Sequence, residues 1–399
     1  MRTLVTLLLS VTASLSAADN WIQEGNEAFY NLDFDQSIAA YEKALAASPD
    51  DPILHNHLAH ALLYRELFRD GALESELVSG NNSFIRRPKL ETPADVEKRF
   101  FAGIDRAMQL SQARIAKNPR DTVALHALSV SFALRANYGF LVRKSWKTSL
   151  SDSSQAHKYD NQVTALEPDN YDARLLQGGY DYFVGQLPWT VRALGFIAGF
   201  HGDKQRGLRT IEEVAVKGNE NRVDAQIVLC ALYRREGQAT RAIPLASQLI
   251  QRYPRNYLLR FEMAQMYASL GNRRDALNTL REIGRLKREN APGYERVPWE
   301  KIYYETGNLE FWFDDFGRAL DNLRKVTETP EQLNELDLNT GVLALMRQGQ
   351  IYDLQKNHNL AVKAYQQAVK FAPAAEAARE SQHYINSPYS RPIRNQERG

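Results

Sequence analysis

The sequence has 399 residues, of which 50 are lysine or arginine and 48 are aspartate or glutamate, and this near-balance argues against nucleic acid as the main partner, because phosphate binding needs a basic excess. The chain is longer than one hydrophobic core ordinarily organises, and its length suits a stacked array in which each unit contacts only its neighbours. Its single cysteine, Cys230, excludes an intramolecular disulfide.

The first residues predict an export signal. Met1–Thr3 is a short basic start, Leu4–Ala13 is an apolar run interrupted only by threonine and serine, and Ser16–Ala18 supplies small residues for cleavage. The run is too short to span a bilayer, and no later stretch is apolar enough to do so. We therefore expect residues 1–18 to be a cleavable signal peptide, removed before Asp19, and the mature chain to be periplasmic or extracellular. The alternative is a buried N-terminal helix.

Two blocks at helical spacing, separated by a turn, recur along the remaining chain. The first unit carries Gly25, Phe29, Ser37, Tyr41, Ala44 and Pro49. Later units carry Cys230, Tyr233, Gly237 and Ala242, then Ala264, Tyr267, Gly271 and Ala276, then Gly307 and Ala319. The last unit is the clearest, with Gly349, Tyr352, Ala361, Tyr365, Ala368 and Pro373. This pattern resembles the tetratricopeptide repeat (TPR), a helix-turn-helix unit of about 34 residues in which small residues let the helices approach closely.

The resemblance implies an all-α, TPR-type α-solenoid over residues 19–384. Such a solenoid coils as a right-handed superhelix, with the first helix of each repeat on its concave face. Three stretches exceed the repeat length and are expected to be insertions, helical in the middle repeats: residues 71–93, 136–150 and 186–204. The polar residues 385–399 are predicted to form a disordered tail.

The last insertion carries a second, more specific resemblance. Residues 188–208 join a proline-led apolar helix to a turn with Gly199, Gly202 and Asp203, and then to a helix start at Gly207. This segment resembles the signature of the eukaryotic tetratricopeptide-39 family, which includes an inclusion-body clearance protein. The predicted signal peptide departs from that intracellular family, so the whole chain looks like a bacterial secreted TPR protein of unassigned function. Asp203 is the expected N-cap of the next helix.

Two of the insertions combine aromatic and basic residues and predict a binding site. Because repeat insertions tend to project from one face, we expect the two to meet and to form a pocket for an apolar ligand or a peptide. The candidate residues are Tyr138, Arg143, Trp146, Trp189, Arg192 and Phe196. The alternatives are a packed plug, with lysine and arginine stems covering apolar surface, and a contact with a membrane surface.

Catalytic motifs are missing from the sequence, which has no glycine-rich phosphate loop, Gly-x-Ser-x-Gly elbow or His-Glu-x-x-His motif. His57 and His60 share a helix face and are the candidates for metal binding, but no nearby acidic or cysteine residue completes a ligand set with them in sequence, so polar positions on the concave face are favoured.

We therefore predict a protein without enzymatic activity or a cofactor: a scaffold or adaptor of the periplasm or cell envelope that binds a protein or peptide on its concave face. The alternatives are a carrier or sensor with an apolar ligand in the insertion pocket, and a metal-dependent enzyme at His57 and His60.

Overall fold

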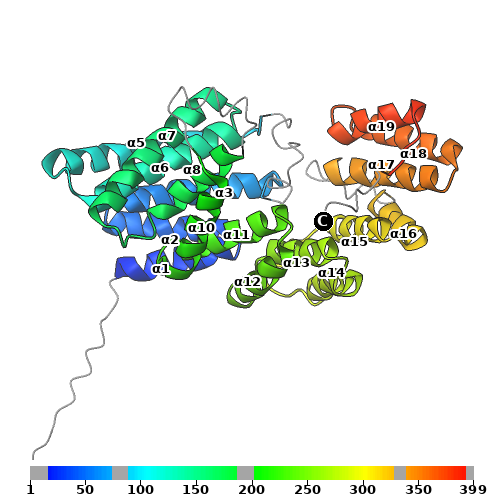
Figure 1. The fold of residues 1–399 in the computed structure, drawn as a ribbon, viewed down its shortest axis with the longest axis horizontal. Coiled ribbons are helices and arrows are strands. Elements are labelled where there is room, and N and C mark those ends of the chain that lie inside the picture. Colours follow the sequence, from blue (N-terminus) through cyan, green and yellow to red (C-terminus); the bar gives the residue numbers. More distant parts are fainter. Residues whose placement is uncertain (1–16, 74–88, 187–201, 328–337, 392–399) are drawn as a thin grey trace, which may run out of the picture.

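The computed structural model describes residues 17–73, 89–186, 202–327 and 338–391, and these residues form 17 α-helices (Figure 1). The helices are α1 (Ala17–Tyr30), α2 (Phe34–Ala47), α3 (Pro52–Arg69), α5 (Ala94–Lys117), α6 (Thr122–Leu141), α7 (Trp146–Leu166), α8 (Arg174–Gly185), α10 (Lys204–Lys217), α11 (Arg222–Arg235), α12 (Ala239–Arg252), α13 (Tyr257–Ser269), α14 (Arg273–Arg288), α15 (Trp299–Trp312), α16 (Phe316–Thr327), α17 (Leu338–Leu354), α18 (His358–Phe371) and α19 (Glu376–Asn386). Among these helices, none has the length and apolar character needed to cross a membrane.

Consecutive helices pack in pairs, from α1 with α2 through to α17 with α18, and α19 covers the last pair. First helices of neighbouring pairs also touch, as α3 touches α6 and α15 touches α17. Figure 1 shows the pairs following one another along the chain. The prediction of an all-α, TPR-type α-solenoid is therefore confirmed.

Small residues on the first helices make this pairing possible. A Cβ atom added to Gly25 would lie 2.5 Å from a ring carbon of Tyr41, and one added to Gly349 would overlap the ring of Tyr365 in the same way. The aromatic ring of each second helix therefore packs directly on the backbone of its partner. Several helices begin with a side-chain cap. The prediction that Asp203 caps α10 is confirmed, since its carboxylate accepts a 2.9 Å hydrogen bond from the backbone N–H of Arg206.

The predicted insertions have different outcomes. The surplus at 136–150 lengthens both helices of its repeat, so that α6 and α7 have 20 and 21 residues where α1 has 14. Residues 74–88 and 187–201 lie outside the described residues. Residues 71–73 form a turn at the end of α3, and the segment that begins at residue 89 passes the end of α6, where the N–H of Leu90 donates to the carbonyl of Val142 at 3.2 Å.

The prediction of a disordered tail from residue 385 is wrong for residues 385–391. Residues 385 and 386 complete α19, and the following segment, Ser387–Arg391, lies against α15 and α17. Its polar composition indicated disorder, but Tyr389 and Arg391 find partners on those helices. Residues 392–399 lie outside the described residues.

The N-terminal repeat packs on distant helices as well as on its neighbours. The Tyr30 hydroxyl donates to Asp224 of α11 at 3.0 Å, and the Tyr30 ring lies 5.1 Å from that of Tyr253, between centroids. Asp33 pairs at 2.7 Å with both Arg255 and Arg296. A shared hydrophobic cluster continues from α1–α3 into α13–α15. The solenoid therefore closes, with α1 beside α11–α13.

Candidate functional site

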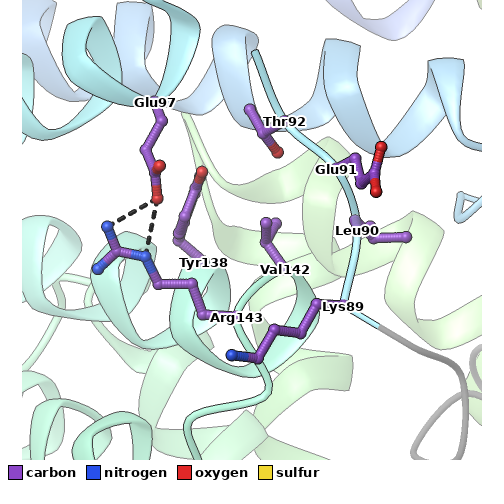
Figure 2. Close-up of a pocket in the computed structure, with 8 residues that line it drawn as sticks. All are labelled: Lys89, Leu90, Glu91, Thr92, Glu97, Tyr138, Val142 and Arg143. Atoms are coloured by element: carbon purple, nitrogen blue, oxygen red, sulfur yellow. Dashed lines mark hydrogen bonds and ion pairs between the residues drawn. The ribbon is translucent and has the colours of Figure 1, made fainter. Parts of the chain in front are cut away.

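A pocket of about 440 Å³ lies where residues 89–92 pass over the start of α5 and the end of α6 (Figure 2). Its walls combine two basic, two acidic, two aliphatic and two hydroxyl side chains: Lys89, Arg143, Glu91, Glu97, Leu90, Val142, Thr92 and Tyr138. Two residues predicted for the binding site, Tyr138 and Arg143, are therefore brought together here.

Arg143 is fixed by an acid and by two rings. Its guanidinium lies 2.7 Å from a carboxylate oxygen of Glu97, and Figure 2 shows the two side chains meeting at the rim. The same group lies 4.4 Å from the ring centre of Phe101 and 5.6 Å from that of Tyr138. Lys144, with φ of 56°, ends α6 in a left-handed turn. The turn leaves Arg143 at the helix C-terminus, where a cation is favoured.

Tyr138 forms the floor of the pocket. Its side chain is 1% exposed, and its ring stacks on Phe100 with centroids 4.6 Å apart. Burial raises the pKa of Tyr138 to about 12, so its hydroxyl stays protonated at neutral pH. The Tyr138 hydroxyl lies close enough to Thr92 and Glu97 to interact with both, although among the described residues neither it nor the Thr92 hydroxyl makes a hydrogen bond of good geometry. Such groups favour a bound water or a polar ligand group.

The charges of the pocket limit what it binds. Two cations face two anions, and the best-placed cation, Arg143, is already paired with Glu97. An anionic ligand would have to displace that carboxylate. Neutral polar groups, such as the amide of a peptide, fit the hydroxyls of Tyr138 and Thr92 better.

The other predicted site residues lie elsewhere. Trp146, at the start of α7, is 47% exposed and packs edge-to-face on Phe140 with centroids 4.6 Å apart, and it does not line the pocket. Trp189, Arg192 and Phe196 lie outside the described residues. A pocket shared by both insertions therefore stays a prediction.

His57 and His60 are packing residues of the N-terminal repeat. The His57 ring stacks on Tyr41 at 5.2 Å, and the His60 ring lies 4.7 Å from Phe29 and 4.4 Å from Tyr64, all between centroids. Burial lowers the pKa of His57 to about 4 and that of His60 to about 3, so both are neutral at pH 7. Within the described ranges, no group of three or more histidine, cysteine or acidic side chains could hold a metal ion.

A second surface lies on the first helices of the last two pairs, and sequence reasoning missed it. We define the α15–α17 face by Phe311, Trp312, Asp314, Arg347 and Asp353. The Arg347 guanidinium lies 4.3 Å from the ring centre of Phe311 and 5.3 Å from that of Trp312. The Trp312 side chain is 42% exposed. The available signal was the aromatic run at residues 311–313, which one amphipathic helix cannot bury entirely against its partner.

Comparison with known proteins identifies the class. Tetratricopeptide repeat models match residues 22–72, 233–296 and 342–374. These ranges contain the first repeat, the repeat with Ala264 and Ala276, and the closing repeat, and they leave out the unit with Gly307 and Ala319. The chain is therefore an α-solenoid that contains tetratricopeptide repeats. No curated protein sequence matches this chain.

Several solved helical-repeat structures are similar in fold. The crystal structure of yeast Tom70 is 13% identical and covers 92% of this chain and 95% of its own, with a TM-score of 0.39. A tetratricopeptide repeat protein from Parabacteroides merdae is 12% identical and covers 83% and 100%, with a TM-score of 0.33. The human IFIT1 dimer is 15% identical and covers 93% and 80%, with a TM-score of 0.43. At these identities no function is transferred to this chain.

Proposed function

We propose that this chain is a non-enzymatic scaffold or adaptor that binds a protein or peptide partner on the first helices of its repeats. Tetratricopeptide repeats support the proposal, because solenoids present extended surfaces to partners. The observation that carries it is the α15–α17 face, where half-exposed Trp312 lies beside the guanidinium of Arg347. Tryptophan and arginine are the residues that most often anchor protein interfaces.

The proposal includes a location in the periplasm or cell envelope. The predicted signal peptide supports export, and α1 begins at Ala17, next to the predicted cleavage site before Asp19. Asp19 lies in the first turn of α1, where an acidic side chain is favoured. The intact mass of the protein recovered from its natural compartment tests this point. We expect a chain that starts at Asp19, whereas a cytoplasmic chain retaining Met1 would overturn the location.

Site-specific photo-crosslinking in cells tests the binding surface. A photoreactive amino acid placed at position 312 is expected to yield one or a few protein adducts of discrete mass. The matched control is position 216 on α10, where Val216 is 75% exposed. Adducts at 312 and not at 216 support the scaffold, while no adduct at 312, or the same adducts at both positions, contradicts it.

The pocket of Figure 2 favours a second candidate function, a carrier or sensor of a small ligand. Solvent extraction of the purified chain followed by mass spectrometry is the test. We expect a ligand of this pocket to be lost from Arg143→Ala and retained by Trp146→Ala. Loss from both variants would instead assign it to the predicted site between the insertions, and an extract without ligand would leave the scaffold alone.

A further inference from the structure

The segment Ser387–Arg391 lies on the α15–α17 face as an extended chain. Over residues 388–391 alternate side chains are partly buried, since Tyr389 and Arg391 face the helices while Pro388 and Ser390 are exposed. Side chains of an extended segment point to opposite sides in turn. The contact therefore depends on the pair of side chains at Tyr389 and Arg391.

Arg391 is bound by charge and by aromatic rings. Its guanidinium pairs with Asp314 at 2.8 Å and donates to the backbone carbonyl of Phe311. It also lies 4.9 Å from the ring centre of Phe311 and 5.7 Å from that of Trp312. A planar guanidinium can make both kinds of contact at once, which the compact ammonium of a lysine does less well. This position on the face therefore selects arginine.

Tyr389 is bound through its backbone and its ring. Its N–H donates to Asp353 at 2.8 Å, and its ring centre lies 6.4 Å from that of Phe311. The Asp353 side chain is fully buried and is held in place by the Tyr365 hydroxyl at 2.8 Å and by the His358 ring at 2.7 Å. A fixed carboxylate that accepts from a backbone N–H is an arrangement suited to peptides of many sequences.

We propose that the α15–α17 face is a peptide-binding site, that Tyr389–Arg391 is its resident ligand, and that the partner presents an extended segment with an aromatic residue followed two positions later by arginine. The inference rests on the proposed scaffold function and names the partner class for it. Exchange is feasible because, within the described residues, only two hold the segment: Tyr389, through its N–H to Asp353 and its ring against Phe311 and Tyr384, and Arg391, through Asp314 and the Phe311 carbonyl. The tail then competes with the partner, since tethering gives it an effective concentration of about 1 mM.

The test measures binding of the chain's own segment in trans. The probe is a fluorescein-labelled peptide with the sequence of residues 385–394, and the receptor is the full chain carrying Tyr389→Ala and Arg391→Ala. We expect saturable fluorescence anisotropy with this variant. For an intrinsic Kd of about 0.1 mM, the resident tail raises the apparent Kd of the unaltered chain about tenfold.

Two controls make the readout specific. A probe with serine in place of its tyrosine and first arginine is expected not to bind. Adding Asp314→Asn removes the charge that faces Arg391, and asparagine readily adopts the left-handed φ of 62° found there. This change is expected to weaken probe binding several-fold with an unchanged melting temperature.

The inference is overturned if the double variant melts as a folded protein and gives no saturable signal, or if the serine probe binds equally well. Equal affinity of the probe for the unaltered chain and the double variant would overturn the role of the tail as resident ligand. Probe binding without adducts at position 312 would contradict the scaffold and keep the peptide site. Adducts at position 312 without probe binding would contradict the peptide site and keep the scaffold.

Discussion

Acid is expected to loosen the N-terminal repeat through two imidazoles, those of His57 and His60, that are partly buried against aromatic rings. The pKa of His57 is lowered to about 4 and that of His60 to about 3, against 6.5 for a free ring, because burial disfavours the charged form. The unfolded chain therefore binds protons that the folded chain does not. Stability is complete above pH 6.5 and falls as the pH drops from 6.5 towards 4.

The size of the effect follows from these values. At pH 5, each ring favours the unfolded state by about 2 kcal/mol more than at pH 8. Asp224 acts in the opposite direction, because burial raises its pKa to about 6 and the folded chain takes up that proton first. Proton uptake by Asp224 raises the free energy of unfolding by about 1.4 kcal/mol at pH 5, relative to pH 8. The net loss from the three groups is about 2–3 kcal/mol.

Hydrogen exchange at α1 and α3, compared at pH 8 and pH 5 after correction for intrinsic rates, is the direct assay, since a repeat array need not unfold in one step. Between pH 8 and pH 5, the free energy of unfolding of His60→Gln is expected to fall by about 2 kcal/mol less than that of the unaltered chain. The control is His383→Gln, at an exposed position on α19, which should keep the original dependence. If His60→Gln also keeps that dependence, the reasoning is refuted.

The other predictions concern packing and closure. Gly349→Ala forces a Cβ into the Tyr365 ring and should cost about 1–3 kcal/mol, whereas Gly179→Ala enters open space on a helix and should stabilise by up to about 1 kcal/mol; calorimetry that ranks them equally would contradict the helix contact. Ala368→Trp, at a side chain with 0% exposure, should lower the melting temperature through overpacking of about 1–3 kcal/mol or more, and an unchanged melting curve would show the position to be open. Asp33→Ala leaves two arginines without their shared carboxylate and should speed exchange in α1 by an amount equivalent to about 1 kcal/mol, while exchange in α18 stays constant.

The repeat architecture could be predicted because its determinants are local. Gly25 and Tyr41 lie about half a repeat apart, and the Tyr41 ring packs in the space that the missing side chain of Gly25 leaves. A glycine and an aromatic residue at this spacing therefore indicate a helix pair. The closing contact could not be predicted in the same way. Tyr30 and Asp224 are 194 positions apart, and only the accumulated rotation of the intervening pairs brings them together.

The candidate site was partly predictable for a related reason. Tyr138 and Arg143 lie near one helix end, so helical spacing alone places them together. Trp146 follows the left-handed turn at Lys144 and starts a new helix, which directs it elsewhere. For the tail, polar composition indicated disorder, although the spacing of Tyr389 and Arg391 was a signal for one buried side of an extended segment.

The contact between α1 and α11–α13 restricts how this chain can change. An open array can gain or lose a whole repeat with only local adjustment, because each unit meets its neighbours alone. Here, removal of a pair such as α6–α7 would shift α1 relative to α11 and leave Tyr30 and Asp224 without each other. The number of helix pairs between α1 and α11 is therefore fixed by the hydrogen bond between Tyr30 and Asp224 and by the hydrophobic cluster that α1–α3 share with α13–α15. During synthesis, the hydrophobic cluster of the N-terminal repeat is complete only after α13–α15 have been made. Folding of this chain therefore includes a step that depends on contacts between residues far apart in sequence.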